Sequence, residues 1–540
     1  MKRRIKRVLL LFLVLLQCIS LLACSAEPKH WTDRPENVIE DKYRTFYEVF
    51  VYSFCDSNGD GVGDIPGVTQ KLDYIDELGF NGIWLMPIMP SPSYHKYDTT
   101  DYYEIDPEYG TLEDFKTFLE ECHKRNIRVI IDLAMNHTSS DHPWFREAVR
   151  YLQQLPEGAD PDPRECPYVD YYHFSREPAA GYAPIEGTAW YYEGIFWSGM
   201  PDVNLKNETV RREFEAIADF WIDLGVDGFR LDAVKEFYSG DRYANIEILS
   251  WFNSHVKSRN PEQYIVCECW DSKAEYSEYY ASGVDSLFDF SFGERSGVIC
   301  SVLSGKNPAK AYGKLMEENE ALYASFSDSH INAPFYTNHD MGRTSGYYFN
   351  EHAMAQTKMG NGMNLMMTGN AFLYYGEELG MKGSGIDENK RAPMYWSKDP
   401  NAEGMCDGPA AMEEFAMKYD SLEEQKADPM SIYNYVRQAV LLRNQNPEIA
   451  RGAVKFQESY SGEALCVLTK SYNGRELLMV FNTSDAAVSV SLEGLLVQEQ
   501  SVEKLTVLGE LLTSEDAVAI SGNEVTMPAY SILVMGVPAK

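Results

Sequence analysis

Four short apolar segments of this 540-residue chain end in acidic or polar side chains, and this pattern constrains the fold more than any other feature. The clearest segment is 224–232, Leu-Gly-Val-Asp-Gly-Phe-Arg-Leu-Asp, which has the composition of a buried strand and ends at Asp232. Strand alternation places Arg230 and Asp232 on one face. At the carboxyl end of a parallel barrel strand, that face looks into the mouth where active sites lie. A guanidinium beside a carboxylate favours the ionised form, which suits a nucleophile.

Three further segments have the same form. Residues 264–268 end in Glu268, 334–340 end in Asp340, and 127–137 end in Asn136 and His137. A salt bridge or a capped strand end would explain any one of them. Unpaired buried charge is costly, so three strand-end acids in one chain favour acid chemistry at a shared mouth over a structural role.

Apolar segments alternate with amphipathic helical patterns over most of the chain. Helices are expected at 68–78 and 112–125. Strands are expected at 46–54, 80–86, 127–133, 226–231, 264–268, 286–290, a segment running into Asn338, and 371–375. Eight strands alternating with helices predict an α/β fold, a (β/α)8 or TIM barrel, over residues 42–445.

Two regions do not fit this alternation. Residues 138–204 are too long for a plain loop in a compact domain and are rich in Tyr, Pro and Trp. They predict a small inserted domain, domain B, after the third strand. Residues 453–540 carry short alternating strands, which predict a C-terminal antiparallel β-sandwich.

These segments, in this order, resemble the conserved regions of the α-amylase family of glycoside hydrolases, family 13. The resemblance runs from about Tyr47 to the C-terminus and rests on five motifs. They are Asp132-Leu-Ala-Met-Asn136-His137, Gly228-Phe-Arg-Leu-Asp232, Glu268-Cys-Trp270, Thr337-Asn-His339-Asp340, and the additional region Met200-Pro201-Asp202-Val203-Asn204. The last motif is similar to that of a group intermediate between α-amylases and oligo-1,6-glucosidases.

The resemblance implies a retaining glycosidase mechanism with two catalytic carboxyl groups. Asp232 is then the nucleophile, Glu268 the general acid/base, and Asp340 the group that stabilises the transition state. Asp132 is expected to be structural. The resemblance also implies contacts with the sugar beside the cleaved bond from Tyr97, Asp98, His137, Arg230, His339 and Arg391.

Specificity is indicated by the residues after the nucleophile. Ala233 resembles α-1,4-acting members, whereas α-1,6-specific relatives tend to carry valine there. Lys235-Glu236 replaces the Lys-His of many α-amylases, which leaves the leaving-group side, and any calcium contact there, open. The predicted activity is hydrolysis of internal α-1,4 bonds in starch, maltodextrin or related α-glucans. The alternative is an exo-acting α-glucosidase or neopullulanase-like enzyme on short malto- or isomalto-oligosaccharides. A non-catalytic sugar-binding lipoprotein is disfavoured because all three acids are present.

The loop after the first strand has the spacing of a calcium loop, D-x-N-x-D-G-x-x-D. It supplies oxygen ligands from Asp56, Asn58, Asp60, Asp64 and the Val62 carbonyl. Gly67 stands where an EF-hand has its twelfth-position Glu, so the loop is not an EF-hand. The same loop occurs in some members of the resembled family. A structural Ca²⁺ is therefore expected, and a turn-rich acidic loop without metal is the alternative.

The N-terminus predicts export. Residues 2–7 are mostly basic, residues 8–16 are apolar, and Leu21-Leu22-Ala23-Cys24 follows. This is typical of a bacterial lipoprotein signal peptide over residues 1–23, with the lipid on Cys24 and a polar tether over 24–41. An ordinary secretory signal with an incidental cysteine is the alternative. The expected location is the outer face of the bacterial plasma membrane, where the lipid is the contact with the membrane.

The formal net charge of −34 argues against nucleic acid or an anionic lipid surface as a partner. No obligate protein partner is evident. After Cys18 and Cys24, eight cysteines remain without C-x-x-C spacing. Buried free thiols are expected, and pairings such as Cys166 with Cys406 stay open.

Overall fold

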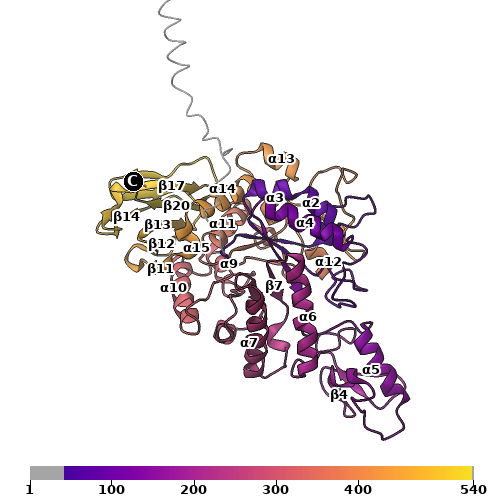
Figure 1. The fold of residues 1–540 in the computed structure, drawn as a ribbon. Helices are drawn as coiled ribbons and strands as arrows, with labels where there is room; N and C mark the ends of the chain where they lie inside the picture. Colours follow the sequence, from indigo (N-terminus) through magenta and orange to yellow (C-terminus); the bar gives the residue numbers. More distant parts are fainter. Residues whose placement is uncertain (1–41, 538–540) are drawn as a thin grey trace, which may run out of the picture. The chain divides into compact units, whose positions relative to one another are not determined.

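The architecture is that of the predicted barrel, seen in a computed structural model that describes residues 42–537. The predicted signal peptide, the Cys24 lipidation site and the tether lie outside these residues. Seven parallel strands form one sheet in the order β10-β1-β2-β3-β7-β8-β9 (Figure 1). Their bounds are Phe46–Val49 (β1), Gly82–Leu85 (β2), Arg128–Leu133 (β3), Gly228–Leu231 (β7), Tyr264–Cys267 (β8), Ser286–Leu287 (β9) and Phe372–Tyr374 (β10).

The sheet closes into a barrel through two isolated parallel bridges. Phe288, just after β9, pairs with Ala333, and Phe335 pairs with Phe372 of β10. The predicted seventh strand into Asn338 takes its place in the barrel between β9 and β10, but only as single bridges and not as a continuous strand. Pro334 explains the interruption because it has no N–H to donate, although its carbonyl accepts from the Phe372 N–H at 2.8 Å.

The first strand is also shorter than predicted, because the chain leaves β1 after Val49 and turns into a 3-10 helix at Val51–Ser53. Gly228 starts β7 for a steric reason. A Cβ at this position would lie 2.0 Å from the Tyr264 carbonyl of β8, so the two strands approach closely only without a side chain.

Helices cover the outside of the sheet, and their ends follow local signals. A capping box of Thr111 and Asp114 begins α4, and Gly225 in the left-handed region ends α6. The predicted helix 68–78 is two helices separated at Lys71. The helices are Ile65–Gln70 (α2), Leu72–Leu78 (α3), Leu112–Lys124 (α4), Glu208–Leu224 (α6), Arg242–Arg259 (α7), Lys273–Tyr276 (α8), Val298–Leu303 (α9), Lys310–Ala324 (α10), Ala353–Leu365 (α11), Asp387–Lys390 (α12), Leu422–Ala427 (α13), Ile432–Gln445 (α14) and Pro447–Arg451 (α15).

Aromatic rings fill the interior of the barrel. Phe46 stacks on Phe372 with ring centroids 4.7 Å apart, and Phe288 meets the same ring edge-on at 5.0 Å. Trp84 and Phe335 complete this buried cluster. Such rings make a rigid floor beneath the polar side chains at the carboxyl ends of the strands.

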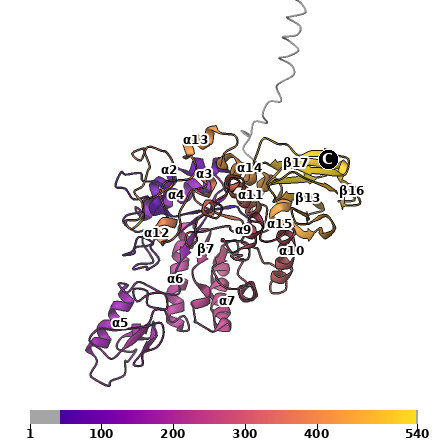
Figure 2. The ribbon, with the colours of Figure 1, turned by 180° about the vertical axis from the view of Figure 1, so that it is seen from behind.

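The segment between β3 and α6 carries its own small structure. It contains α5 (Pro143–Gln154) and an antiparallel sheet of β4 (Phe174–Ser175), β6 (Tyr191–Glu193) and β5 (Tyr182–Pro184). A bridge from His137 to Asp202 joins its two ends, and a bridge from Tyr172 to Val203 ties its middle to the same end. The segment projects from the barrel on the side away from the C-terminal strands in both views (Figures 1 and 2).

Antiparallel sheets follow the barrel, as predicted. One contains β11 (Ala453–Phe456), β12 (Leu465–Tyr472), β13 (Arg475–Asn482), β20 (Ser531–Gly536) and β17 (Thr506–Leu511), in that order. The other contains β14 (Val488–Ser491), β19 (Glu524–Met527) and β18 (Ala519–Ser521), and a ribbon pairs β15 (Leu496–Val497) with β16 (Gln500–Ser501). Val467, Val480 and Leu533 of the first sheet share a buried apolar cluster with Val525 of the second.

All eight cysteines in the described residues are buried free thiols, so Cys166 and Cys406 are not paired there. Within residues 42–537, none of the helices combines the length and apolar character needed to cross a membrane.

Candidate active site

The three strand-end acids meet at one cavity of about 580 Å³. Asp232 follows β7, Glu268 follows β8, and Asp340 follows the bridge segment that closes the barrel. All the parallel strands point their carboxyl ends to this side, as expected for the mouth of such a barrel. The cavity is lined by His95, Tyr97, His137, Phe196, Trp197, Met200, Asp232, Ala233, Glu268, Trp270, Asp340, Asp387 and Arg391.

One buried guanidinium lies between three carboxylates. The Nη1 of Arg230 lies 2.6 Å from Asp232 Oδ1 and 2.9 Å from Asp132 Oδ1, and its Nη2 lies 3.0 Å from Glu268 Oε2. Arg230 has no solvent exposure. The predicted contact between Arg230 and Asp232 is thus present. A single positive charge shared in this way cannot neutralise three ionised acids, so the site favours a proton on one of them.

Glu268 is the acid that suits proton transfer. Burial raises its pKa to about 7, with a further rise from Asp232 and Asp340, and Arg230 opposes the shift. The Ala233 N–H also donates to Glu268 Oε2 at 3.1 Å. A carboxyl group that titrates near neutral pH can serve as acid and then as base. Burial raises the pKa of Asp132 to about 6, but Asp132 lies behind the cavity wall.

Asp340 is in the opposite state. Its Oδ2 lies 3.0 Å from His339 Nε2, and its Oδ1 accepts from Arg391 Nη2 at 3.0 Å. Burial alone would raise the pKa of Asp340, but His339 and Arg391 hold it well below its usual range. The cavity therefore holds one acid that gains a proton easily and one that stays ionised.

The six predicted sugar-binding residues divide into two groups. Tyr97, His137 and Arg391 line the cavity, whereas Asp98, Arg230 and His339 lie one layer behind it. His137 lines the cavity but is only 2% exposed, and both of its ring nitrogens are enclosed. Asp98 uses its Oδ1 to accept from Ser91 Oγ at 2.7 Å and from Ser93 Oγ.

Several residues of the cavity wall were not predicted from the sequence. Phe196, Trp197 and Trp270 are about half exposed, which is unusual for such large apolar side chains. They offer ring faces on which a sugar can stack. Trp270 stood inside a quoted motif, but Phe196 and Trp197 come from the irregular segment before Met200, where no spacing indicates a role. His95 was also missed, although it precedes Tyr97 by two residues.

The predicted calcium loop is folded around its own acidic side chains. Asp56 accepts from the Gly61 N–H at 2.8 Å, Asn58 from the Asp60 N–H at 2.9 Å, and Asp60 from the Val62 N–H at 2.9 Å. Each of these oxygens keeps a second lone pair, so the oxygen donor set is chemically suited to Ca²⁺. The residues described contain no group of three or more His, Cys, Asp or Glu side chains arranged to hold a metal.

This barrel, with its three acids at the mouth, defines a glycoside hydrolase. A family model described as "Alpha amylase, catalytic domain" matches residues 48–452. The chain belongs to the α-amylase family.

Individual relatives extend this comparison. "Alpha-amylase 3" of Dictyoglomus thermophilum is 37% identical over 77% of this chain and 79% of that protein. The solved structure of Eubacterium rectale Amy13B is 50% identical, with a TM-score of 0.91, and covers 93% of this chain and 97% of that one. "Oligo-1,6-glucosidase" of Parageobacillus thermoglucosidasius is 27% identical over 87% of this chain and 96% of that protein.

Proposed function

We propose that the protein is a retaining α-amylase that cleaves internal α-1,4 bonds of starch, maltodextrin or related α-glucans. The observation that carries the proposal is the set of three carboxyl groups in one cavity, in which Asp232 and Glu268 share the Arg230 guanidinium and Asp340 pairs with Arg391. The exposed aromatic rings of the wall suit a glucan chain.

The proposed reaction has two steps. Asp232, paired with Arg230, attacks the anomeric carbon and forms a glycosyl ester, while Glu268 gives its proton to the leaving oxygen. Glu268, now ionised, then takes a proton from the water that hydrolyses the ester. Asp340 stays ionised and stabilises the positively charged transition state, with Arg391 fixing its Oδ1.

The α-1,4 assignment rests on two observations. Ala233, a small residue beside the nucleophile, lines the cavity in a left-handed conformation with a φ of 49°. The relative with 37% identity is named an alpha-amylase. The oligo-1,6-glucosidase relative favours the second candidate, an exo-acting α-glucosidase on short oligosaccharides.

The test is a product analysis of the purified protein on amylose, pullulan and a short α-1,6-linked oligosaccharide. Rapid loss of iodine staining from amylose with mixed maltodextrin products is expected. Glucose released mainly from short chains, with amylose left long, would instead establish the exo-acting candidate.

Glu268→Gln serves as the matched control in this assay. It should abolish hydrolysis while the protein still binds maltodextrin, because only the proton donor is lost. A wild-type protein that binds maltodextrin and hydrolyses none of the substrates would overturn the enzymatic proposal in favour of a sugar-binding protein.

Two further features belong to the proposal. We infer that Asp56, Asn58, Asp60, Asp64 and the Val62 carbonyl hold a structural Ca²⁺, which would stabilise the loop and take no part in bond cleavage. We also infer that the chain is exported and lipid-anchored through Cys24 to the outer face of the bacterial plasma membrane. Both rest on the sequence patterns described above.

A further inference from the structure

Glu48 on β1 is a buried carboxylate to which the proposed mechanism gives no role. Its Oε1 lies 2.7 Å from Nδ1 of His339, and both side chains are about 1% exposed. It is the only charged residue of its strand, Phe-Tyr-Glu-Val. A lone acid inside a barrel is costly unless it is paired, and here its partner is the residue before Asp340.

The hydrogen bonds around His339 fix its protonation state. Its Nδ1 faces Glu48 and its Nε2 faces Asp340 Oδ2 at 3.0 Å. Ionised carboxylates only accept hydrogen bonds, and a neutral imidazole has a single N–H. Burial raises the pKa of Glu48, and His339 and Arg230 oppose that rise. With Glu48 and Asp340 both ionised, both ring nitrogens carry hydrogen, which makes His339 an imidazolium. Burial lowers its pKa, but Asp340 and Glu48 together raise it to about 9.

Tyr97 is part of the same arrangement. Its hydroxyl donates to Asp132 Oδ2 at 3.0 Å, and its oxygen lies 2.8 Å from His339 Nε2, so the single N–H of Nε2 is shared between Tyr97 and Asp340. The Tyr97 ring also stacks on the imidazole with centroids 5.6 Å apart. A rotation of His339 would thus displace both a wall residue and Asp340.

The charges around the imidazole come from several elements. Carboxylates favour the imidazolium, while two arginines oppose it, and the uncharged ring of Trp84 on β2 packs against it in a T-shaped arrangement with centroids 5.6 Å apart. The titratable and charged groups are Glu48 on β1, Tyr97 in the loop after β2, Asp132 on β3, Arg230 on β7, Tyr374 on β10, Asp340, and Arg391 after α12. Among the residues that the structure describes, Glu48 is the hydrogen-bond partner of Nδ1, so it decides whether that nitrogen keeps its proton.

We propose that Glu48 is a positioning residue that holds His339 as an imidazolium and through it fixes Asp340 and Tyr97 for transition-state stabilisation. The proposal rests on the proposed glycosidase function for its catalytic part. It gives His339 a role within the protein, because both of its ring nitrogens are already bonded. The effect on catalysis is indirect, since Glu48 does not reach the cavity.

The experiment compares the wild type with Glu48→Gln, which keeps the shape and an acceptor but removes the charge. Histidine-selective ¹⁵N NMR follows the His339 ring, assigned by loss of its signal in His339→Asn. In the wild type, the ring should titrate near pH 9. In Glu48→Gln, the midpoint should fall by about one to three units, the effect of losing one adjacent opposite charge.

Kinetics supply the second readout. Glu48→Gln should lower kcat by about 10- to 100-fold, as expected when a catalytic group is slightly misplaced, with the loss growing above pH 7. Glu48→Asp keeps the charge and should restore part of both readouts. Glu378→Gln is the matched control, because Glu378 is a buried carboxylate beside Tyr47 that accepts only from Tyr47 and Tyr74. It should change neither the His339 titration nor the pH profile.

An unchanged His339 midpoint in Glu48→Gln would overturn the proposal. A shifted midpoint with an unchanged pH profile of kcat would also overturn it, because the imidazolium would then not matter to the reaction. If the protein hydrolyses no glucan at all, the proposed function fails, and the NMR titration still decides whether Glu48 sets the state of His339.

Discussion

At the scale of single residues, charge balance decides which acid carries the proton. Arg230 divides its charge among Asp132, Asp232 and Glu268, while Asp340 has two cations of its own. Glu268 receives too little positive charge to offset its burial, so its pKa lies near 7 and it is the acid that can carry a proton there. This division explains how a site built from identical functional groups can supply an acid and an anion together.

The proton on Glu268 predicts the alkaline limit of activity. Because its pKa is raised to about 7 and the acid must be protonated in the first step, kcat/KM should fall above about pH 7. Asp132→Asn should move this limb to lower pH by about one unit, since Arg230 then acts more strongly on Glu268. The pH dependence of kcat/KM on a maltodextrin measures both effects.

Asp289→Asn is a suitable control for this prediction. Asp289 is equally buried, but its partners are Tyr276, Asn319 and Asn332, away from Arg230. The alkaline limb of the kcat/KM profile of Asp289→Asn should match that of the wild type. If the alkaline limb of the kcat/KM profile does not move in Asp132→Asn, the sharing of Arg230 does not set the pKa of Glu268.

Residue-level prediction from the sequence succeeded where an acid ends a strand. Period-2 alternation and the common direction of parallel strands bring Asp232 and Glu268 together without any knowledge of loops, and Asp340 joins them although its segment makes only single bridges. Glu48 could not be identified in this way, because its partner His339 is 291 residues away in the chain and only the closed barrel brings them together. The exposure of Phe196 and Trp197 likewise depends on how an irregular segment folds.

At the scale of elements, the sequence predicted the order of strands and helices better than their regularity. The apolar segment before Asn338 does form part of the barrel wall, but Pro334 limits its pairing to single bridges. The run from Phe46 to Phe54 stays apolar beyond β1 because the 3-10 helix after it is also buried. Hydrophobicity reports burial, and a buried turn has the same composition as a buried strand.

The loop between β1 and α2 gives a prediction at this scale. Ca²⁺ at about 100 times its Kd should stabilise the folded protein by about 2.7 kcal/mol, which raises Tm by a few degrees. Chelation by EDTA should reverse the change. Asp60→Ala should remove the response, because Asp60 is exposed and its side chain otherwise accepts only from the Val62 N–H.

The control for the calcium prediction is Asp101→Ala. Asp101 is also exposed and makes the same type of bond, to the Tyr103 N–H at 2.9 Å, outside the loop. Calorimetry with and without calcium should show that this variant responds like the wild type. A response that survives in Asp60→Ala would assign the ion to another place and contradict the loop as its site.

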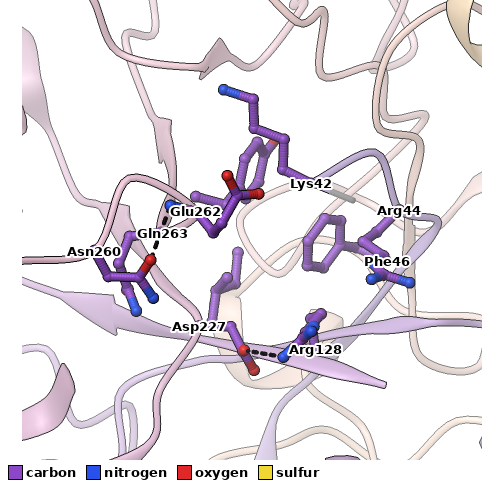
Figure 3. A pocket seen from close by; sticks show the side chains of 10 residues that line it. Lys42, Arg44, Phe46, Arg128, Asp227, Asn260, Glu262 and Gln263 are labelled. Atoms are coloured by element: carbon purple, nitrogen blue, oxygen red, sulfur yellow. Dashed lines mark hydrogen bonds and ion pairs between the residues drawn. The ribbon is translucent and has the colours of Figure 1, made fainter. Parts of the chain in front are cut away.

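At the scale of the whole molecule, the described chain begins at the end of the barrel opposite the cavity. Lys42 lines a separate pocket of about 350 Å³ with Phe46, Arg128 and Tyr264, the first residues of β1, β3 and β8 (Figure 3). Arg128 pairs there with Asp227, the residue before β7, at 2.9 Å. Because all the strands are parallel, their amino-terminal ends face away from the catalytic acids. The lipid anchor that we infer at Cys24 would therefore join the described chain at the end of the barrel opposite the cavity.

This placement predicts that anchoring does not hinder attack on long glucans. The lipidated protein on vesicles should cleave amylose with a kcat/KM within about twofold of that of a soluble form lacking Cys24, because the described chain begins at the end of the barrel opposite the cavity. In contrast, the soluble form carrying Tyr243→Cys can be coupled to a maleimide lipid at the start of α7, beside the mouth. Tyr243 is 74% exposed, whereas the cysteines of the described chain are buried, so coupling is selective. Held by this residue, the enzyme should lose activity on amylose but keep it on maltotriose. Equal activity on amylose in both orientations would show that the attachment point does not control access to the cavity.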